Sequence, residues 1–114
     1  MKVKHLIAQT IWLPGALYGA DKPVVSVLLP TFRRAKSGLF LKAVNSVLNQ
    51  TLMALELIII DDASTDGTAA IIAEIMAKDG RVSCLKHPVN IGLPAVSEFE
   101  GFQKARGQIG RAHV

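Results

Sequence analysis

The feature that most constrains the fold is a pair of continuous apolar runs, each followed by a polar loop and then by a helical pattern. The runs are "VVSVLLP" at residues 24–30 and "LELIIID" at residues 55–61. Runs so rich in β-branched and aliphatic residues are typical of strands that are buried on both faces. Such strands belong to parallel sheets that carry helices on both sides. The sequence therefore predicts an α/β protein.

Helical spacing of apolar residues follows each run, over residues 38–49 and again over residues 67–78. A shorter strand pattern covers residues 81–86, and a third helical pattern covers residues 94–106. Three successive strand–helix units imply a parallel sheet with right-handed crossovers. We therefore expect a parallel sheet of βαβαβα units.

The third predicted helix has its own apolar stripe. Within residues 94–106, apolar side chains recur at helical spacing at Val96, Phe99, Phe102 and Ala105. A stripe with this spacing normally faces the core. We expect these four side chains to pack against the sheet.

Size and composition bound the partners and the chemistry. The chain has 114 residues, which suits one small domain, and its formal net charge is +4 with basic and acidic residues interspersed. Only 5% of the residues are aromatic, so a nucleic-acid partner is not expected. Cys84 is the lone cysteine and fits a reducing compartment such as the cytoplasm. His5, His87 and His113 do not have metal-ligand spacing, and no dinucleotide, P-loop or nucleophile-elbow motif occurs.

Residues 1–22 precede the first predicted strand. Lys2 and Lys4 before an apolar segment give a superficial likeness to a signal peptide, but Pro14 and Tyr18 argue against one. The segment is too short and too broken to span a bilayer. We expect a leader or peripheral, loosely packed segment at residues 1–22 and one domain over residues 23–114.

Polar loops follow all three predicted strands. They contain Thr31–Lys36, the pair Asp61–Asp62, and Asn90–Gly92. In parallel α/β sheets, ligands bind outside the carboxyl ends of the strands. We expect the three loops to meet at one rim of the sheet.

The charged side chains in two of these loops could each bind a ligand or simply face solvent. Because side chains alternate along a strand, only one of Asp61 and Asp62 can face a shared crevice. A carboxylate there could accept hydrogen bonds from a base or a sugar, or bind a metal, or it could belong to a solvated turn that caps the next helix. Arg33 and Arg34 suit a diphosphate, and equally suit a solvated charge run.

Four segments in a fixed order resemble the amino-terminal half of family-2 glycosyltransferases. They are "PVVSVLLPTFRR", "AVNSVLNQT", "LELIIIDDASTDGT" and "HPVNIG". Each piece alone is weak, but the ordered set over residues 23–107 is specific. The resemblance implies a partial GT-A-type, Rossmann-like fold that binds the nucleotide of a sugar donor.

The resemblance also implies roles for individual residues. The loop after the first strand would line the base pocket, Asp62 would bind the base or the ribose, and Asp61 and Ser64 would support the turn. Beyond what the resemblance implies, Arg33 or Arg34 is our candidate for the cation that meets the phosphates. Carried over by position, the nucleotide-binding residues are Pro30, Thr31, Phe32, Arg33, Asp62, Asn90 and Gly92.

The chain departs from the family pattern in two places. Val96, Ser97 and Glu98 stand where the family usually has an Ala-Arg-Asn group, and "QIGRAHV" stands where the family continues toward an Asp-x-Asp cluster. The complete family is expected to use a divalent cation, Mg²⁺ or Mn²⁺, through that cluster. We therefore expect this chain to lack the metal ligands and the catalytic base, and to be inactive alone. We also expect an unpaired sheet edge that favours self-association.

The first hypothesis is thus the donor-nucleotide-binding part of an enzyme that transfers a sugar from a nucleotide-sugar donor, such as a UDP-sugar, to an acceptor. A catalytically inactive nucleotide-binding remnant or module is the alternative. A phosphoacceptor signalling domain fits less well, because such a domain has its acid pair after the first strand, whereas Asp61 and Asp62 follow the second predicted strand.

Overall fold

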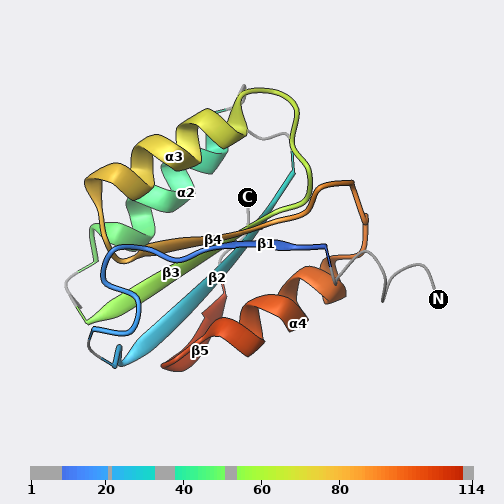
Figure 1. Cartoon of the computed structure of the whole chain (residues 1–114). Helices are drawn as coiled ribbons and strands as arrows, with labels where there is room; N and C mark the ends of the chain where they lie inside the picture. Colours follow the sequence, from blue (N-terminus) through green and yellow to red (C-terminus); the bar gives the residue numbers. More distant parts are fainter. Residues whose placement is uncertain (1–8, 21, 33–37, 51–53, 112–114) are drawn as a thin grey trace.

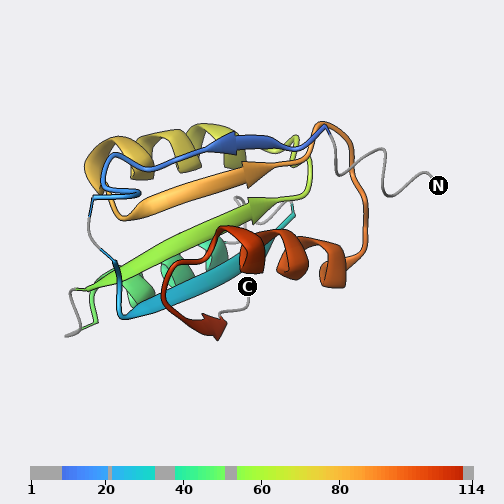
Figure 2. The same cartoon turned by 60° about the horizontal axis from the view of Figure 1, so that its bottom comes forward.

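The computed structural model describes residues 9–20, 22–32, 38–50 and 54–111. In these ranges a five-stranded sheet has the order β1-β4-β3-β2-β5, with α2 and α3 on one face and α4 on the other (Figures 1 and 2). The elements in chain order are β1 Ile11–Leu13, β2 Val25–Thr31, α2 Leu39–Leu48, β3 Leu55–Asp61, α3 Thr68–Lys78, β4 Val82–Lys86, α4 Pro94–Lys104 and β5 Gln108–Arg111.

The three predicted strands are confirmed as β2, β3 and β4, which lie parallel and adjacent. Thr31 pairs with Asp61, and Asp61 pairs with Lys86, so the three carboxyl ends are level. The loops that leave these ends therefore start at one edge of the sheet.

The core has two layers because successive side chains of a strand point to opposite faces. The layer under α2 and α3 consists of Val27, Leu29, Phe40, Val44, Val47, Leu55, Leu57, Ile59, Ile72, Val82 and Cys84. The layer toward α4 is smaller and consists of Leu28, Ile58, Ile60 and Leu85. Both faces of β2 and β3 are thus buried, as their continuous apolar runs predict.

The segment before β2 differs from the predicted loosely packed leader. Residues 11–13 form β1, which pairs antiparallel with β4, so the sheet is mixed rather than wholly parallel. The Gly15 N–H donates to Ser83 Oγ at 2.8 Å, and the Tyr18 hydroxyl donates to the Lys104 carbonyl at 2.8 Å. A Cβ at Gly15 would lie 2.2 Å from the Val82 carbonyl oxygen, so only glycine permits this approach. Residues 1–8 lie outside the described ranges.

The sheet edges also differ from the prediction. The sequence predicts an unpaired edge beside the three strands, but β1 covers the edge of β4 and β5 pairs parallel with β2. The outer strands of the described sheet are therefore the short β1 and β5.

The prediction that Phe99 and Phe102 of the third helix face the core is wrong, whereas Ala105 does pack against the smaller core layer. Phe99 and Phe102 are 55% and 60% exposed, and Ser97, Glu100 and Gly101 are buried. A Cβ at Gly101 would lie 3.1 Å from side-chain carbons of both Leu28 and Ile60. Close approach of α4 to the sheet therefore selects the face that carries the glycine, and it turns the two phenylalanines outward.

This orientation of α4 predicts that substitutions at two neighbouring residues change the free energy of unfolding by very different amounts. Gly101→Leu should lower the free energy of unfolding by about 1–3 kcal/mol, because the added atoms overfill the contact with Leu28 and Ile60. Phe102→Gln should change it by less than about 0.5 kcal/mol, because the side chain is exposed. Urea denaturation followed by circular dichroism measures both. If Phe102→Gln proved the more destabilising of the two, Phe102 would face the core after all.

Candidate functional site

A hollow lies at the carboxyl edge of β2 and β3, where the three loops meet, and we call it the rim hollow. Its volume is about 290 Å³. It is lined by Pro30, Thr31, Phe32, Asp62, Asn90, Gly92, Leu93, Pro94 and Ser97. Every predicted nucleotide-binding residue that the structure describes therefore lines one hollow, and Arg33 lies outside the described residues.

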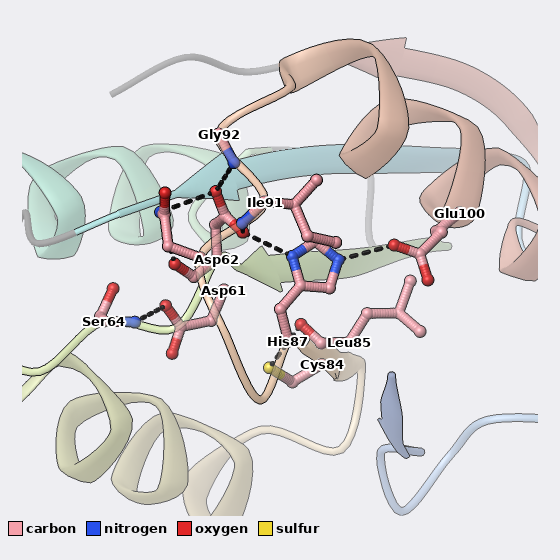
Figure 3. A network of polar contacts seen from close by, with 10 residues as sticks. Asp61, Asp62, Ser64, Cys84, Leu85, His87, Ile91, Gly92 and Glu100 are labelled. Carbon is pink, nitrogen blue, oxygen red and sulfur yellow. Dashed lines mark hydrogen bonds and ion pairs between the residues drawn. The ribbon is translucent and has the colours of Figure 1, made fainter. Parts of the chain in front are cut away.

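The two adjacent aspartates point to opposite faces of the sheet, as strand alternation requires (Figure 3). Asp61 is fully buried, and its Oδ1 accepts a hydrogen bond from the Ser64 N–H at 3.1 Å. Ala63, which lies between Asp62 and Ser64 in the chain, takes a left-handed conformation with φ of 61°. Asp61 and Ser64 thus support the turn, as predicted, and Asp62 is the member of the pair that lines the hollow.

The Asp62 carboxylate is surrounded by hydrogen-bond donors from the loop after β4 (Figure 3). Its Oδ1 accepts from the Ile91 N–H at 2.8 Å and lies 2.7 Å from His87 Nδ1. Its Oδ2 accepts from the Gly92 N–H at 2.8 Å and from Asn90 Nδ2 at 2.9 Å. An ionised carboxylate offers about four acceptor positions, so donors of the protein fill them all. Asp62 is the residue that closes this loop.

These contacts set the charge state of Asp62. Burial alone would raise the pKa of its carboxyl group, but the hydrogen bonds from Ile91, His87 and Gly92 together hold that pKa below its ordinary value. The carboxylate is therefore ionised at neutral pH, which is the form that accepts hydrogen bonds from its neighbours or from a ligand.

His87 and Glu100 complete the cluster, and sequence reasoning missed both. The His87 side chain is fully buried, and its Nε2 lies 2.6 Å from Glu100 Oε1, so a carboxylate faces each ring nitrogen. His87 follows β4 directly, and Glu100 lies in the middle of α4. The signal that could have found Glu100 is the i, i+3, i+4 spacing of Ser97, Glu100 and Gly101, which marks the buried face.

Two further residues shape the hollow. Gly92 has a positive φ of 72°, a conformation that favours glycine, and it allows both Ile91 and Gly92 to point their N–H groups at Asp62. Ser97, on the buried face of α4, lines the hollow. It is one of the residues that replace the Ala-Arg-Asn group of the family pattern.

A resident metal ion does not fit the site as described. Within residues 9–20, 22–32, 38–50 and 54–111, no group of three His, Cys, Asp or Glu side chains could hold one. Asp62, His87 and Glu100 instead bind one another. We therefore derive no step through a metal at these residues.

The burial of Cys84 determines the reactivity of its thiol. Burial, and then the charge of Asp61, raises the pKa of the buried Cys84 thiol to about 12, so this thiol is a poor nucleophile. None of the helices in the described part of the chain has the length and apolar character needed to cross a membrane.

Sequence comparisons identify relatives of the chain. A family model described as "Glycosyl transferase family 2" matches residues 26–110. An uncharacterized glycosyltransferase of Haemophilus influenzae is 39% identical over 87 residues, which are 76% of this chain and 34% of that protein. The putative teichuronic acid biosynthesis glycosyltransferase TuaG of Bacillus subtilis is 34% identical over 87 residues, which are 76% of this chain and 33% of that protein. The chain thus spans about a third of the length of these relatives.

Comparison with solved structures confirms the predicted fold class. TarS residues 1–349 of S. aureus, solved in complex with UDP-GlcNAc, superimpose with a TM-score of 0.69 at 24% identity, covering 78% of this chain and 26% of that chain. The mannosyltransferase PcManGT of Pyrobaculum calidifontis, solved with GDP-Man and Mn²⁺, gives a TM-score of 0.58 at 19% identity, covering 87% and 29%. The chain has a partial GT-A, Rossmann-like α/β fold.

Proposed function

Because the chain belongs to glycosyl transferase family 2, we propose that its rim hollow binds the nucleotide of a nucleotide-sugar donor. The observation that carries the proposal is the meeting of the loops after β2, β3 and β4 around one ionised carboxylate, that of Asp62. This is the place where open α/β sheets bind ligands. The reaction of the whole protein would be transfer of the sugar from that donor to an acceptor.

Two kinds of contact in the hollow suit a nucleotide. Phe32 lines the hollow, is 40% exposed and offers an aromatic ring on which a base can stack. Asp62, Asn90 and Gly92 line the same hollow and bring polar groups to it. Arg33, outside the described residues, stays the predicted partner of the phosphates. TarS was solved with UDP-GlcNAc and with UDP, which supports uridine diphosphate as the first probe.

The proposal assigns the binding step, and not the transfer step, to this chain. Transfer needs a base for the acceptor and neutralisation of the departing diphosphate. At the rim hollow, the Asp62 carboxylate is already bonded to four donors of the protein. A divalent cation, Mg²⁺ or Mn²⁺, belongs to the proposal for the complete protein, and the Mn²⁺ of PcManGT supports it.

Calorimetric titration with uridine diphosphate tests the proposal. The unchanged chain should bind with a dissociation constant between about 1 μM and 1 mM, the usual range for an enzyme and its substrate. Phe32→Ser and Asp62→Ala should each weaken binding by about tenfold or more. Glu74→Ala is the control, because Glu74 is an exposed residue of α3 that binds Lys78. Repeating the titration with MgCl₂, MnCl₂ or EDTA tests the cation.

The outcomes separate the parts of the proposal. Absence of heat with the unchanged chain would contradict uridine diphosphate as a ligand of the rim hollow, and equal heats from the unchanged chain and Asp62→Ala would remove Asp62 from the site. Binding without any transfer by the complete protein would favour the alternative of an inactive nucleotide-binding module.

Self-association and location complete the proposal. We keep the predicted self-association, and the described sheet would offer β5 for it, a strand of four residues at one side of the sheet. Light scattering should then show dimers or larger species, and a monodisperse monomer would rule them out.

The lone buried Cys84 supports a cytoplasmic location, which fractionation of the source cells would check.

A further inference from the structure

A continuous chain of polar contacts runs from the middle of α4 to the rim hollow. Glu100 contacts His87, His87 contacts Asp62, and Asp62 accepts the N–H groups of Ile91 and Gly92 (Figure 3). We infer that His87 is a positioning residue, which through its contacts with Glu100 and Asp62 holds Asp62 and the loop of residues 90–92 in the geometry that binds the nucleotide. The inference rests on the proposed function and adds to it the means by which the site is kept in shape.

Both ring nitrogens of His87 contact a carboxyl group. His87 Nδ1 lies 2.7 Å from Asp62 Oδ1, and Nε2 lies 2.6 Å from Glu100 Oε1. The side chains of Asp62 and Glu100 are only 13% and 5% exposed, so water cannot readily replace either contact when it is lost.

The groups that face the ring come from two elements. Asp62 approaches from the loop after β3, and Glu100 approaches from α4. Glu100 therefore fixes the orientation of the His87 ring without any contact with the hollow, since Glu100 does not line it.

The four donors around Asp62 differ in how easily a ligand could replace them. Those from Ile91 and Gly92 are backbone N–H groups, and His87 is buried. Asn90 Nδ2 is an exposed side-chain donor on Oδ2. A base or ribose donor could take its position without moving the backbone. During that exchange, His87 and the two backbone groups would keep the carboxylate in place.

The test uses the chain of 114 residues, unchanged and as the variants His87→Gln and Glu100→Gln. Both variants keep a polar side chain of similar size, and circular dichroism first checks that they fold. Phe102→Gln, an exposed substitution on the same helix, is the control. Uridine diphosphate is titrated calorimetrically at pH 7. In parallel, ¹⁵N nuclear magnetic resonance of the free chains follows the backbone amides of Ile91 and Gly92.

We expect His87→Gln to bind uridine diphosphate about tenfold or more weakly than the unchanged chain, because a contact that holds Asp62 is lost. Glu100→Gln keeps an oxygen that can accept from His87, so it should weaken binding less than His87→Gln does. Phe102→Gln should follow the unchanged chain. The amides of Ile91 and Gly92 should shift in His87→Gln and stay in place in Phe102→Gln.

The results would overturn the inference in either of two ways. Amides of Ile91 and Gly92 that stay unshifted in a folded His87→Gln chain would contradict the positioning role even in the absence of ligand. Equal binding by the unchanged chain and by His87→Gln would also contradict it. If the unchanged chain binds no uridine diphosphate, the proposed function fails for that nucleotide, and the amide shifts of the free chain still decide the link between His87 and the loop.

Discussion

His87→Leu should lower the free energy of unfolding by about 2–4 kcal/mol, because a buried acceptor left without its partner costs about 1–3 kcal/mol, and more when it is charged. The substitution leaves Asp62 and Glu100 without the group that lies between them, while their side chains stay 13% and 5% exposed. Leucine fills a similar volume, so the loss reflects unpaired polar groups rather than an empty space. Urea denaturation at pH 7, followed by circular dichroism, measures the effect.

The exposed ion pair on α3 provides the matched control. Glu74 and Lys78 lie 2.9 Å apart, with side chains that are 67% and 74% exposed. Water screens such a pair, so Glu74→Ala should change the free energy of unfolding by less than about 1 kcal/mol. If His87→Leu proved as mild as Glu74→Ala, the buried cluster would not hold α4 to the loop after β4.

Asp62→Asn should lower the free energy of unfolding at pH 7 by about 2–4 kcal/mol, through loss of charge-assisted hydrogen bonds. The carboxylate accepts from two backbone N–H groups, of Ile91 and Gly92, and from the side chains of His87 and Asn90. An asparagine side chain has one acceptor oxygen, and its NH₂ group would face donors at the other position. The loop of residues 90–92 would therefore lose its fixed geometry.

The lowered pKa of Asp62 predicts how the stability of the chain depends on pH. The pKa of Asp62 is lower in the folded chain than its ordinary value, so the folded state favours the ionised form. This contribution is fully present above the ordinary pKa, and it is lost as pH falls from that value through the lower pKa of the folded chain. The unchanged chain should lose stability over this interval more steeply than Asp62→Asn. Parallel acid profiles would speak against the shifted pKa.

The parts of the fold that were predicted correctly are those with long local signals. The runs that form β2 and β3 have seven residues each, and continuous burial leaves a clear pattern at that length. β1 and β5 have three and four residues, too few to show a period. Their pairing depends on the neighbouring strands of the finished sheet, so sequence reasoning assigned one to a leader and left the other unassigned.

The orientation of α4 shows why an apolar stripe alone misleads. Two stripes compete on this helix, one with Phe99 and Phe102 and one with Glu100 and Gly101. Hydrophobicity favours the first, but contact with the sheet needs the glycine, and Glu100 finds His87 only from the second. A buried carboxylate is costly until a partner is supplied, and that partner comes from a distant part of the chain.

By itself, the sequence determined the succession of strand–helix units and the side chains that stand at the strand ends, because backbone periodicity and turn chemistry are local properties. It thereby predicted that the loops with Asp62, Asn90 and Gly92 meet at one rim of the sheet, which is where the rim hollow lies. Only the tertiary structure decided that β1 and β5 enter the sheet, which face of α4 is buried, and that Asp62, His87 and Glu100 form one cluster. Those outcomes depend on contacts between residues far apart in the chain, whose free energies exist only once the sheet and its helices have packed together.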